Sequence, residues 1–175
     1  LLGSRSASDH LKFKDSKSLK IIREGSAPYV FVQAAVARES IERVVIPLDY
    51  TDEDVRDFSW LARLARSHRP HFHVLLPMVE EVADEEMGEY LEANLEDLRR
   101  QLEAEGASFE EHTLDSEQEF SASILEYARS VSADMVVLTS AVDPRKPNSY
   151  MLEPHARRVL LHAGAIPVMI VNPKV

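Results

Sequence analysis

Leu-Leu-His-Ala-Gly-Ala-Ile-Pro at residues 160–167, followed by Val-Met-Ile-Val-Asn at 168–172, is the stretch that decides the fold. It predicts the end of a helix, a glycine turn, a proline and a buried strand. The pattern also occurs 139 residues earlier, where Ile-Ile-Arg-Glu-Gly-Ser-Ala-Pro at 21–28 leads into Tyr-Val-Phe-Val-Gln at 29–33. This offset is too long for a solenoid repeat and fits one α/β domain. The repeat therefore predicts one complete unit preceded by the tail of another.

The repeat divides the chain into three parts. Residues 1–33 are predicted to be the C-terminal remnant of a first unit, residues 34–41 a linker, and residues 42–175 a complete unit. The remnant is expected to contain the end of a strand at 1–5, a helix at 16–24 and a strand at 29–32. We expect Leu19, Ile21 and Ile22 to face inward from that helix. About 33 residues cannot close a hydrophobic core alone, so the remnant needs other apolar surface to cover it.

Apolar strands alternate with amphipathic helices along the complete unit. Strands are predicted at 44–48, 72–79, 109–114, 135–138 and 168–171. Helices are predicted at 51–68, 84–105 and 120–131 and again before Gly164, and Ala141 to Ser149 is expected to be a polar loop. Continuous apolar runs indicate strands that are buried on both faces, and the weakly patterned 109–114 indicates an edge strand. With right-handed crossovers, this order predicts an α/β fold with a doubly wound parallel sheet.

The composition limits the function classes. The chain has 175 residues, 45% of them hydrophobic, no Cys and a formal charge of −10. The absence of Cys excludes thiol chemistry, and the negative charge argues against binding to nucleic acid or to an anionic membrane. The sequence has no apolar run long enough for a membrane span and no signal pattern, so we expect a cytoplasmic protein.

Two stretches resemble a known family. Val-Val-Ile-Pro-Leu-Asp at 44–49 resembles the opening strand of universal stress proteins, and 159–171 resembles their closing helix, proline and strand. The resemblance covers 41–172 as one whole unit and 1–33 as the last third of another, so the chain resembles part of a tandem universal stress protein. It implies a Rossmann-like, adenine nucleotide alpha hydrolase-like fold whose five-stranded sheet has the strand order 3-2-1-4-5.

The resemblance also allows a test for nucleotide binding. Nucleotide-binding members of the family carry Gly-x-x-Gly, a spacer and then Gly-Ser or Gly-Thr after the fourth strand, and these glycines let backbone N–H groups approach the phosphates. The corresponding positions here are Thr139, Val142, Glu153 and Pro154. Side chains narrow this loop, Pro154 removes an N–H donor, and Glu153 adds a negative charge. We therefore expect that the complete unit does not bind ATP.

Other candidate ligand-binding residues come from topology and from the resemblance. Ligands in a doubly wound sheet bind at the carboxyl ends of the strands, which favours Asp49 and the corner at Thr139 and Ser140. By resemblance, Asp49 lies beside an adenosine and Met78 lines its base, although a helix cap and a core residue are the alternative interpretations. In the first part, the positions close to the family's phosphate-loop spacing are Gly3, Ser6 and Ser16. ATP or AMP binding by the first unit is thus an alternative.

Three histidines are the remaining cluster of interest. His71 and His73 alternate onto one face of a strand, and together with His112 they could bind a metal. They have no Cys partner and no helical His partner at ligand spacing, so we expect exposed or hydrogen-bonded histidines and no structural zinc. The sequence contains no nucleophile elbow, zinc-binding helix or Walker loop, and no catalysis is expected.

The resemblance implies a non-enzymatic regulatory protein of the stress response. The alternatives are a nucleotide sensor with its site in the first unit and a cytosolic regulatory domain of a transporter. Universal stress domains are expected, by resemblance, to pair through their fifth strands, which here are Tyr29–Val32 and Val168–Val171. We predict that these strands pair antiparallel about a pseudo-twofold axis, as a homodimer or as a tandem pseudo-dimer within one chain.

Overall fold

The computed structural model describes residues 2–3, 17–25, 27–35, 40–48, 58–78, 85–114, 119–146 and 149–173. Its strands are β1 (Leu2–Gly3), β2 (Tyr29–Val32), β3 (Arg43–Pro47), β4 (His71–Leu76), β5 (Ser108–Thr113), β6 (Met135–Thr139), β7 (Ala141–Val142), β8 (Tyr150–Met151) and β9 (Val168–Val171). Its helices are α1 (Lys17–Glu24), α2 (Ser59–His68), α3 (Glu85–Ala104), α4 (Phe120–Ser130) and α5 (Pro154–His162).

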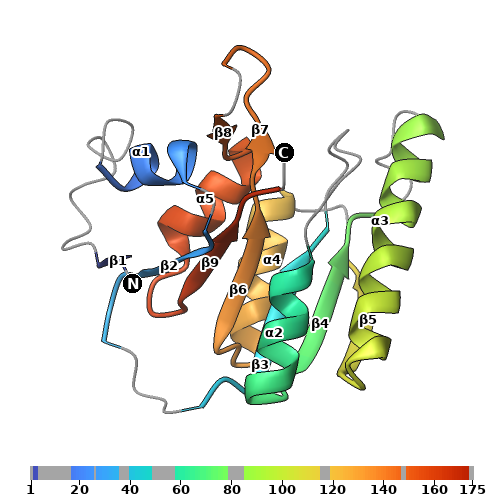
Figure 1. Cartoon of the computed structure of the whole chain (residues 1–175). Coiled ribbons are helices and arrows are strands. Elements are labelled where there is room, and N and C mark those ends of the chain that lie inside the picture. The colour runs from blue at the N-terminus through green and yellow to red at the C-terminus, as the bar shows by residue number, and fades with distance from the viewer. Residues whose placement is uncertain are drawn as a thin grey trace.

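The main sheet has the order β1-β2-β9-β6-β3-β4-β5 (Figure 1). Strands β3, β4, β5, β6 and β9 pair in parallel, and when they are numbered along their own unit their order is 3-2-1-4-5, as predicted. Strand β5 lies at one edge, also as predicted. The expectation of a five-stranded sheet is wrong in one respect, because β1 and β2 continue past β9 and extend the sheet to seven strands.

Helices cover both faces of the sheet, as its apolar central strands require. Val44 and Val45 of β3 are fully buried and face opposite sides. One face packs against α2 and α3, and the other packs against α4, α5 and Ile22 of α1 (Figure 1). Among the described residues, no helix combines the length and apolar character needed to cross a membrane.

Strand β2 pairs antiparallel with β9 inside the same chain. Val30 lies opposite Met169, Tyr29 opposite Ile170, and Phe31 opposite Val168. Val30 and Met169 are separated by the 139-residue offset of the sequence repeat. The same offset relates Tyr29 to Val168 and Phe31 to Ile170, and each of these two residues of β2 pairs with the counterpart of the other. The pairing is therefore centred on a local twofold axis through this residue pair.

Side chains at the ends of β2 and β9 reinforce the pairing. Asn172, which is buried, donates from Nδ2 to the backbone oxygens of Ile22 at 2.8 Å and Gly25 at 2.6 Å. Gln33, its counterpart in the repeat, donates to the backbone oxygen of Leu160 at the end of α5. The amide after each strand therefore binds carbonyl groups near the end of the helix that precedes the other strand.

One expectation about α1 is wrong. Ile22 is 1% exposed and joins the core, but Ile21 is 37% exposed. Consecutive helical residues lie about 100° apart around the axis, so a short helix that packs along one line buries only one of such a pair. The expected helix start at residue 16 lies outside the described residues.

An ion pair attaches the edge strand to α3. The Arg99 guanidinium donates to both carboxylate oxygens of Glu111, each at 2.6 Å, and also contacts the more exposed Glu92 at 3.1 Å. The hydrogen bonds from Arg99 hold the pKa of Glu111 below its ordinary value of 4.5. Because the folded state lowers this pKa, the pair stabilises the fold at neutral pH, and the stabilisation is lost as pH falls through the lowered value.

We expect Glu111→Gln to reduce the free energy of unfolding at pH 7 by up to about 1 kcal/mol. The difference from the wild type should shrink as pH falls below 4.5, where the wild-type carboxylate also becomes neutral. Urea denaturation at several pH values measures both effects. Glu92→Gln is the matched control, since it removes a single exposed contact with the same arginine. If the difference in unfolding free energy between Glu111→Gln and the wild type did not change with pH, the stabilisation could not be assigned to the ionised Glu111 carboxylate.

Candidate functional site

The carboxyl ends of β3, β6 and β9 form the edge at which this fold binds ligands. Asp49 lies outside the described residues. The described part of this edge contains a small apolar hollow of about 10 Å³, room for a single water molecule at most. It is lined by Ile46, Pro47, Leu48, Phe58, Leu61, Val137, Thr139 and Val171. The described residues that line the hollow beside Thr139 are thus mainly hydrophobic.

Ser140, a predicted ligand-binding residue, has a structural contact in this fold. Its side chain is buried, and its Oγ donates to Oδ1 of Asn172 at 2.5 Å. Asn172 in turn uses Nδ2 to hold the backbone of Ile22 and Gly25. The hydroxyl expected to contact a ligand therefore orients the amide that anchors the end of α1.

The segment after β6 differs from the expected polar loop. Residues Ala141–Val142 and Tyr150–Met151 pair as the antiparallel hairpin β7–β8. The backbone N–H of Asp143 donates to the backbone oxygen of Ser149 at 2.7 Å. Helix α1 packs against β8 of this hairpin (Figure 1). Tyr150 is buried, as is Leu152, which joins the core next to α5. The expected polar loop at 141–149 is therefore wrong only at its start, because Ala141 and Val142 form a strand, whereas the described residues from Asp143 to Ser149 form the turn of the hairpin.

The N-terminus of α5 follows this hairpin directly. Glu153 is the N-cap residue and Pro154 is the first helical residue. The backbone oxygen of Glu153 accepts a hydrogen bond from the backbone N–H of Arg157 at 2.9 Å. A helix N-terminus attracts anions through its free N–H groups, but this one has no N–H at Pro154 and a carboxylate beside it.

Of the remaining predicted ligand-binding residues, the two that the structure describes, Met78 and Gly3, lie at different strands of the sheet. Met78 is half-buried just after β4, and Gly3 lies in β1 opposite Val32. Ser6 and Ser16 lie outside the described residues. Among the described members of the predicted set, Thr139 and Ser140 at the end of β6 are the only adjacent pair.

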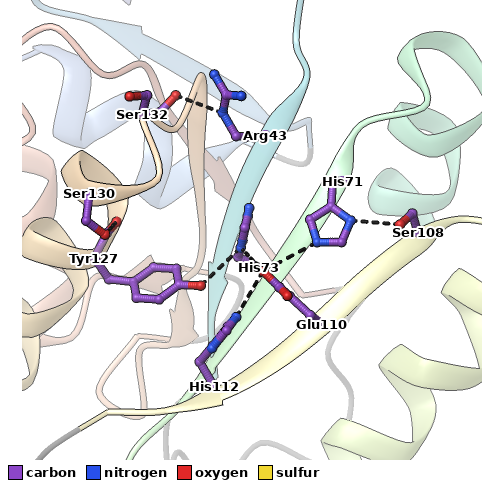
Figure 2. Close-up of polar contacts among 9 residues, drawn as sticks. All are labelled: Arg43, His71, His73, Ser108, Glu110, His112, Tyr127, Ser130 and Ser132. Carbon is purple, nitrogen blue, oxygen red and sulfur yellow. Dashed lines mark hydrogen bonds and ion pairs between the residues drawn. The ribbon is translucent and has the colours of Figure 1, made fainter.

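The structure does bring the histidines together, around a residue that sequence reasoning left out. His71, His73 and His112 all point toward the carboxylate of Glu110 (Figure 2). Glu110 Oε1 lies 2.8 Å from His73 Nδ1, 3.1 Å from His112 Nε2 and 3.5 Å from His71 Nε2. We call His71, His73, Glu110 and His112 the histidine cluster.

Strand register explains the histidine cluster. His71 pairs with Ser108, His73 with Glu110, and Leu75 with His112, so alternate residues of β4 and β5 share one face. The alternation of Ser108, Glu110 and His112 was the available signal, but the register against β4 was needed to interpret it.

Burial and charge act in opposite directions within the histidine cluster. Burial, with the neighbouring His71, lowers the pKa of His73 despite the attraction of Glu110. The contact with His112 lowers the pKa of Glu110, and His73 and His71 act in the same direction. Burial raises the pKa of Tyr127, whose hydroxyl lies 3.1 Å from His73 Nδ1, to about 12. At neutral pH these shifts favour a neutral His73 beside an ionised Glu110.

The parallel sheet, its helices and the carboxyl-edge corner define a protein of the Rossmann-like α/β class. A model of the universal stress protein family matches residues 40–172. The chain therefore belongs to the universal stress protein family. A search of the curated proteins gave no match.

Solved structures with this fold agree. A universal stress protein from Archaeoglobus fulgidus is 23% identical, with a TM-score of 0.56 over 76% of this chain and 98% of that one. The same organism's universal stress protein in complex with dAMP is 22% identical, with a TM-score of 0.53 over 76% and 98% of the two chains. A longer universal stress protein from Archaeoglobus fulgidus DSM 4304 is 13% identical, with a TM-score of 0.67. Its match covers 98% of this chain but 60% of that one.

A double-mutant cycle tests the structural role of Ser140. We expect Asn172→Ala to reduce the free energy of unfolding by about 1–3 kcal/mol, because two carbonyl groups and the Ser140 hydroxyl lose their partner. Ser140→Ala should cost less when Asn172 is already Ala, with a coupling of at least about 0.5 kcal/mol. Urea denaturation measures each variant. Ser40→Ala, which removes an exposed hydroxyl contact with Glu42, is the control. Additive costs would show that Ser140 does not hold Asn172.

Proposed function

We propose that this chain is a cytoplasmic regulatory protein of the stress response whose complete unit acts without a bound nucleotide and without catalysis. The observation that carries the proposal is the β7–β8 hairpin that leads into Glu153 and Pro154 at the start of α5. Family membership supports the regulatory role. The hairpin and the helix start support the proposed absence of nucleotide.

The proposal depends first on the chemistry of phosphate binding. Phosphates bind where successive backbone N–H groups converge at a helix N-terminus. Pro154 offers no N–H at the first helical position, and the adjacent Glu153 brings a negative charge. Repulsion between this carboxylate and a phosphate opposes binding at this helix start.

Space supports the same conclusion. A small-molecule site commonly has a volume of about 300–1,000 Å³. The described hollow beside Thr139 has about 10 Å³. Binding of an adenosine at this place would require displacement of core side chains such as Phe58 and Leu61, both almost fully buried.

We further propose that residues 1–33 are the remnant of a first unit, residues 34–41 a linker and residues 42–175 the complete unit, and that the two units form a tandem pseudo-dimer. The support is the agreement between the sequence offset and the register, in which Val30 lies opposite Met169. The reciprocal contacts of Asn172 and Gln33 add to it.

An engineered disulfide tests the pseudo-dimer. Residues directly opposite each other in an antiparallel pair have Cα atoms about 4.5–5.5 Å apart, which suits a disulfide. The chain has no Cys, so Val30→Cys with Met169→Cys introduces one defined pair. After oxidation we expect a monomeric band with altered mobility on non-reducing gels. The single variant Val30→Cys is the control. A covalent dimer formed by the double variant alone would indicate strands exchanged between two copies.

Calorimetry tests the absence of nucleotide. Titrated with ATP, ADP, AMP or dAMP, the chain should show a Kd weaker than about 1 mM, which corresponds to less than about 4 kcal/mol of binding free energy. Asp49→Ala should leave this weak binding unchanged. A micromolar Kd that is lost in Asp49→Ala would contradict the proposal.

The relative in complex with dAMP favours one alternative, a nucleotide sensor. In this chain the site would then lie in the first unit, at Gly3, Ser6 and Ser16. A micromolar Kd that is lost in Ser16→Ala and retained in Asp49→Ala would support this sensor in place of the proposed function.

A further inference from the structure

The part of the histidine cluster formed by His71, His73 and Glu110 lies toward the amino ends of β4 and β5, whereas His112 is near the carboxyl end of β5. His71 and Ser108 are the first residues of β4 and β5, so this end of the cluster is at the amino end of both strands. The cluster occupies the sheet face that also carries α4, whose Tyr127 contacts His73 (Figure 2). Its chemistry is therefore independent of the proposed function.

Ligand atoms in this cluster converge as a metal site requires. One donor atom each from His71, His73 and Glu110 lies within 4.8 Å of the others. Glu110 Oε1 lies 2.8 Å from His73 Nδ1 and 3.5 Å from His71 Nε2. Around a tetrahedral zinc ion with bonds near 2.0–2.1 Å, ligand atoms are roughly 3.3 Å apart, a value between these two distances. Small side-chain rotations would bring all three to bonding distance.

The polar contacts of His73 leave room for a cation. Its side chain is 7% exposed, and its Nε2 is buried with no hydrogen-bond partner in the described part of the chain. Without a cation, the ionised Glu110 carboxylate at 2.8 Å holds the ring proton on Nδ1, and a metal ion bound there would replace this proton. In the other neutral tautomer, the Nδ1 lone pair faces the Glu110 carboxylate at 2.8 Å, and the two repel each other. A cation between Nδ1 and the carboxylate would attract both atoms and so remove this repulsion.

Neighbouring groups orient the ligands. Ser108 Oγ lies 2.7 Å from His71 Nδ1, a contact that leaves Nε2 directed at the cluster. His112 approaches Glu110 from the other side and fixes its carboxylate. Metal-binding histidines commonly use the second ring nitrogen in this way.

Exposure and donor type indicate the class of ion. Glu110 is 45% exposed and His71 is 36% exposed, so solvent can reach the site and complete the coordination. Two imidazoles and one carboxylate suit zinc and related transition metals, whereas magnesium and calcium prefer oxygen ligands alone.

We propose that His71, His73 and Glu110 bind an exchangeable divalent transition-metal ion, with zinc as the representative, and that Ser108 and His112 are positioning residues. The expectation of no structural zinc concerned a closed site with four protein ligands. The third ligand here comes from the neighbouring strand, and water completes an open site. Bound metal joins β4 to the edge strand β5 and stabilises the folded chain by mass action.

The test uses the full chain, freed of metal with chelator and titrated with Zn²⁺ by calorimetry. We expect one ion to bind per chain, with a micromolar or tighter Kd and a higher melting temperature. Loss of a positioning residue typically weakens metal binding about 10- to 100-fold, and we expect an effect of this size for Ser108→Ala. His71→Ala and Glu110→Gln, at partly exposed positions, should weaken Zn²⁺ binding by more than this. His68→Ala removes an exposed imidazole elsewhere and is the control.

Three outcomes would overturn the proposal, of which two concern the strength of Zn²⁺ binding. One is that the wild type binds Zn²⁺ no more tightly than Mg²⁺. The other is that His71→Ala and Glu110→Gln bind Zn²⁺ as the wild type does, while circular dichroism shows them to be folded. Equal losses in His68→Ala and in the cluster variants would likewise indicate nonspecific histidine binding.

Discussion

The main-chain pairing of β2 with β9 is the constraint on which the rest of the structure depends. It covers a sheet edge that is apolar on both faces and extends the sheet to seven strands. It also places α1 over β8, which gives Asn172 its two carbonyl acceptors and covers the hairpin after β6. The shape of the carboxyl edge is thus set by a segment from the other end of the chain.

Polar groups are used differently at two places on this sheet. At the carboxyl edge, Ser140 and Asn172 bind each other and the backbone near the end of α1. On the face of β4 and β5, the histidines converge on one carboxylate oxygen, and His73 Nε2 is buried with no hydrogen-bond partner among the described residues. The same kinds of polar group thus support the backbone at one place and gather as potential ligands at the other.

Hydrophobic periodicity was sufficient to predict the strands of the parallel sheet and the helices between them, because β3 and its neighbours are buried on both faces. The strand order came from the family resemblance. Periodicity failed where tertiary contacts decide. Ile21 is exposed because α1 packs along one line, and the β7–β8 hairpin forms where α1 packs against β8. The position of Glu110 against His73 depends on the register between two strands, which residue patterns do not specify. The symmetric β2–β9 contact was predictable because the sequence repeats itself.

The hydrogen bond from Asn172 to Ile22 joins residues 150 positions apart. Contacts between distant positions slow folding, since a long loop must close before they form. A ribosome adds about 5–20 residues per second, so the apolar β2 segment emerges many seconds before its partner strand exists. During that interval its unpaired backbone and its phenylalanine are exposed to other chains. The β2 segment is therefore synthesised long before it is protected, and during that interval a chaperone would reduce its contact with other chains.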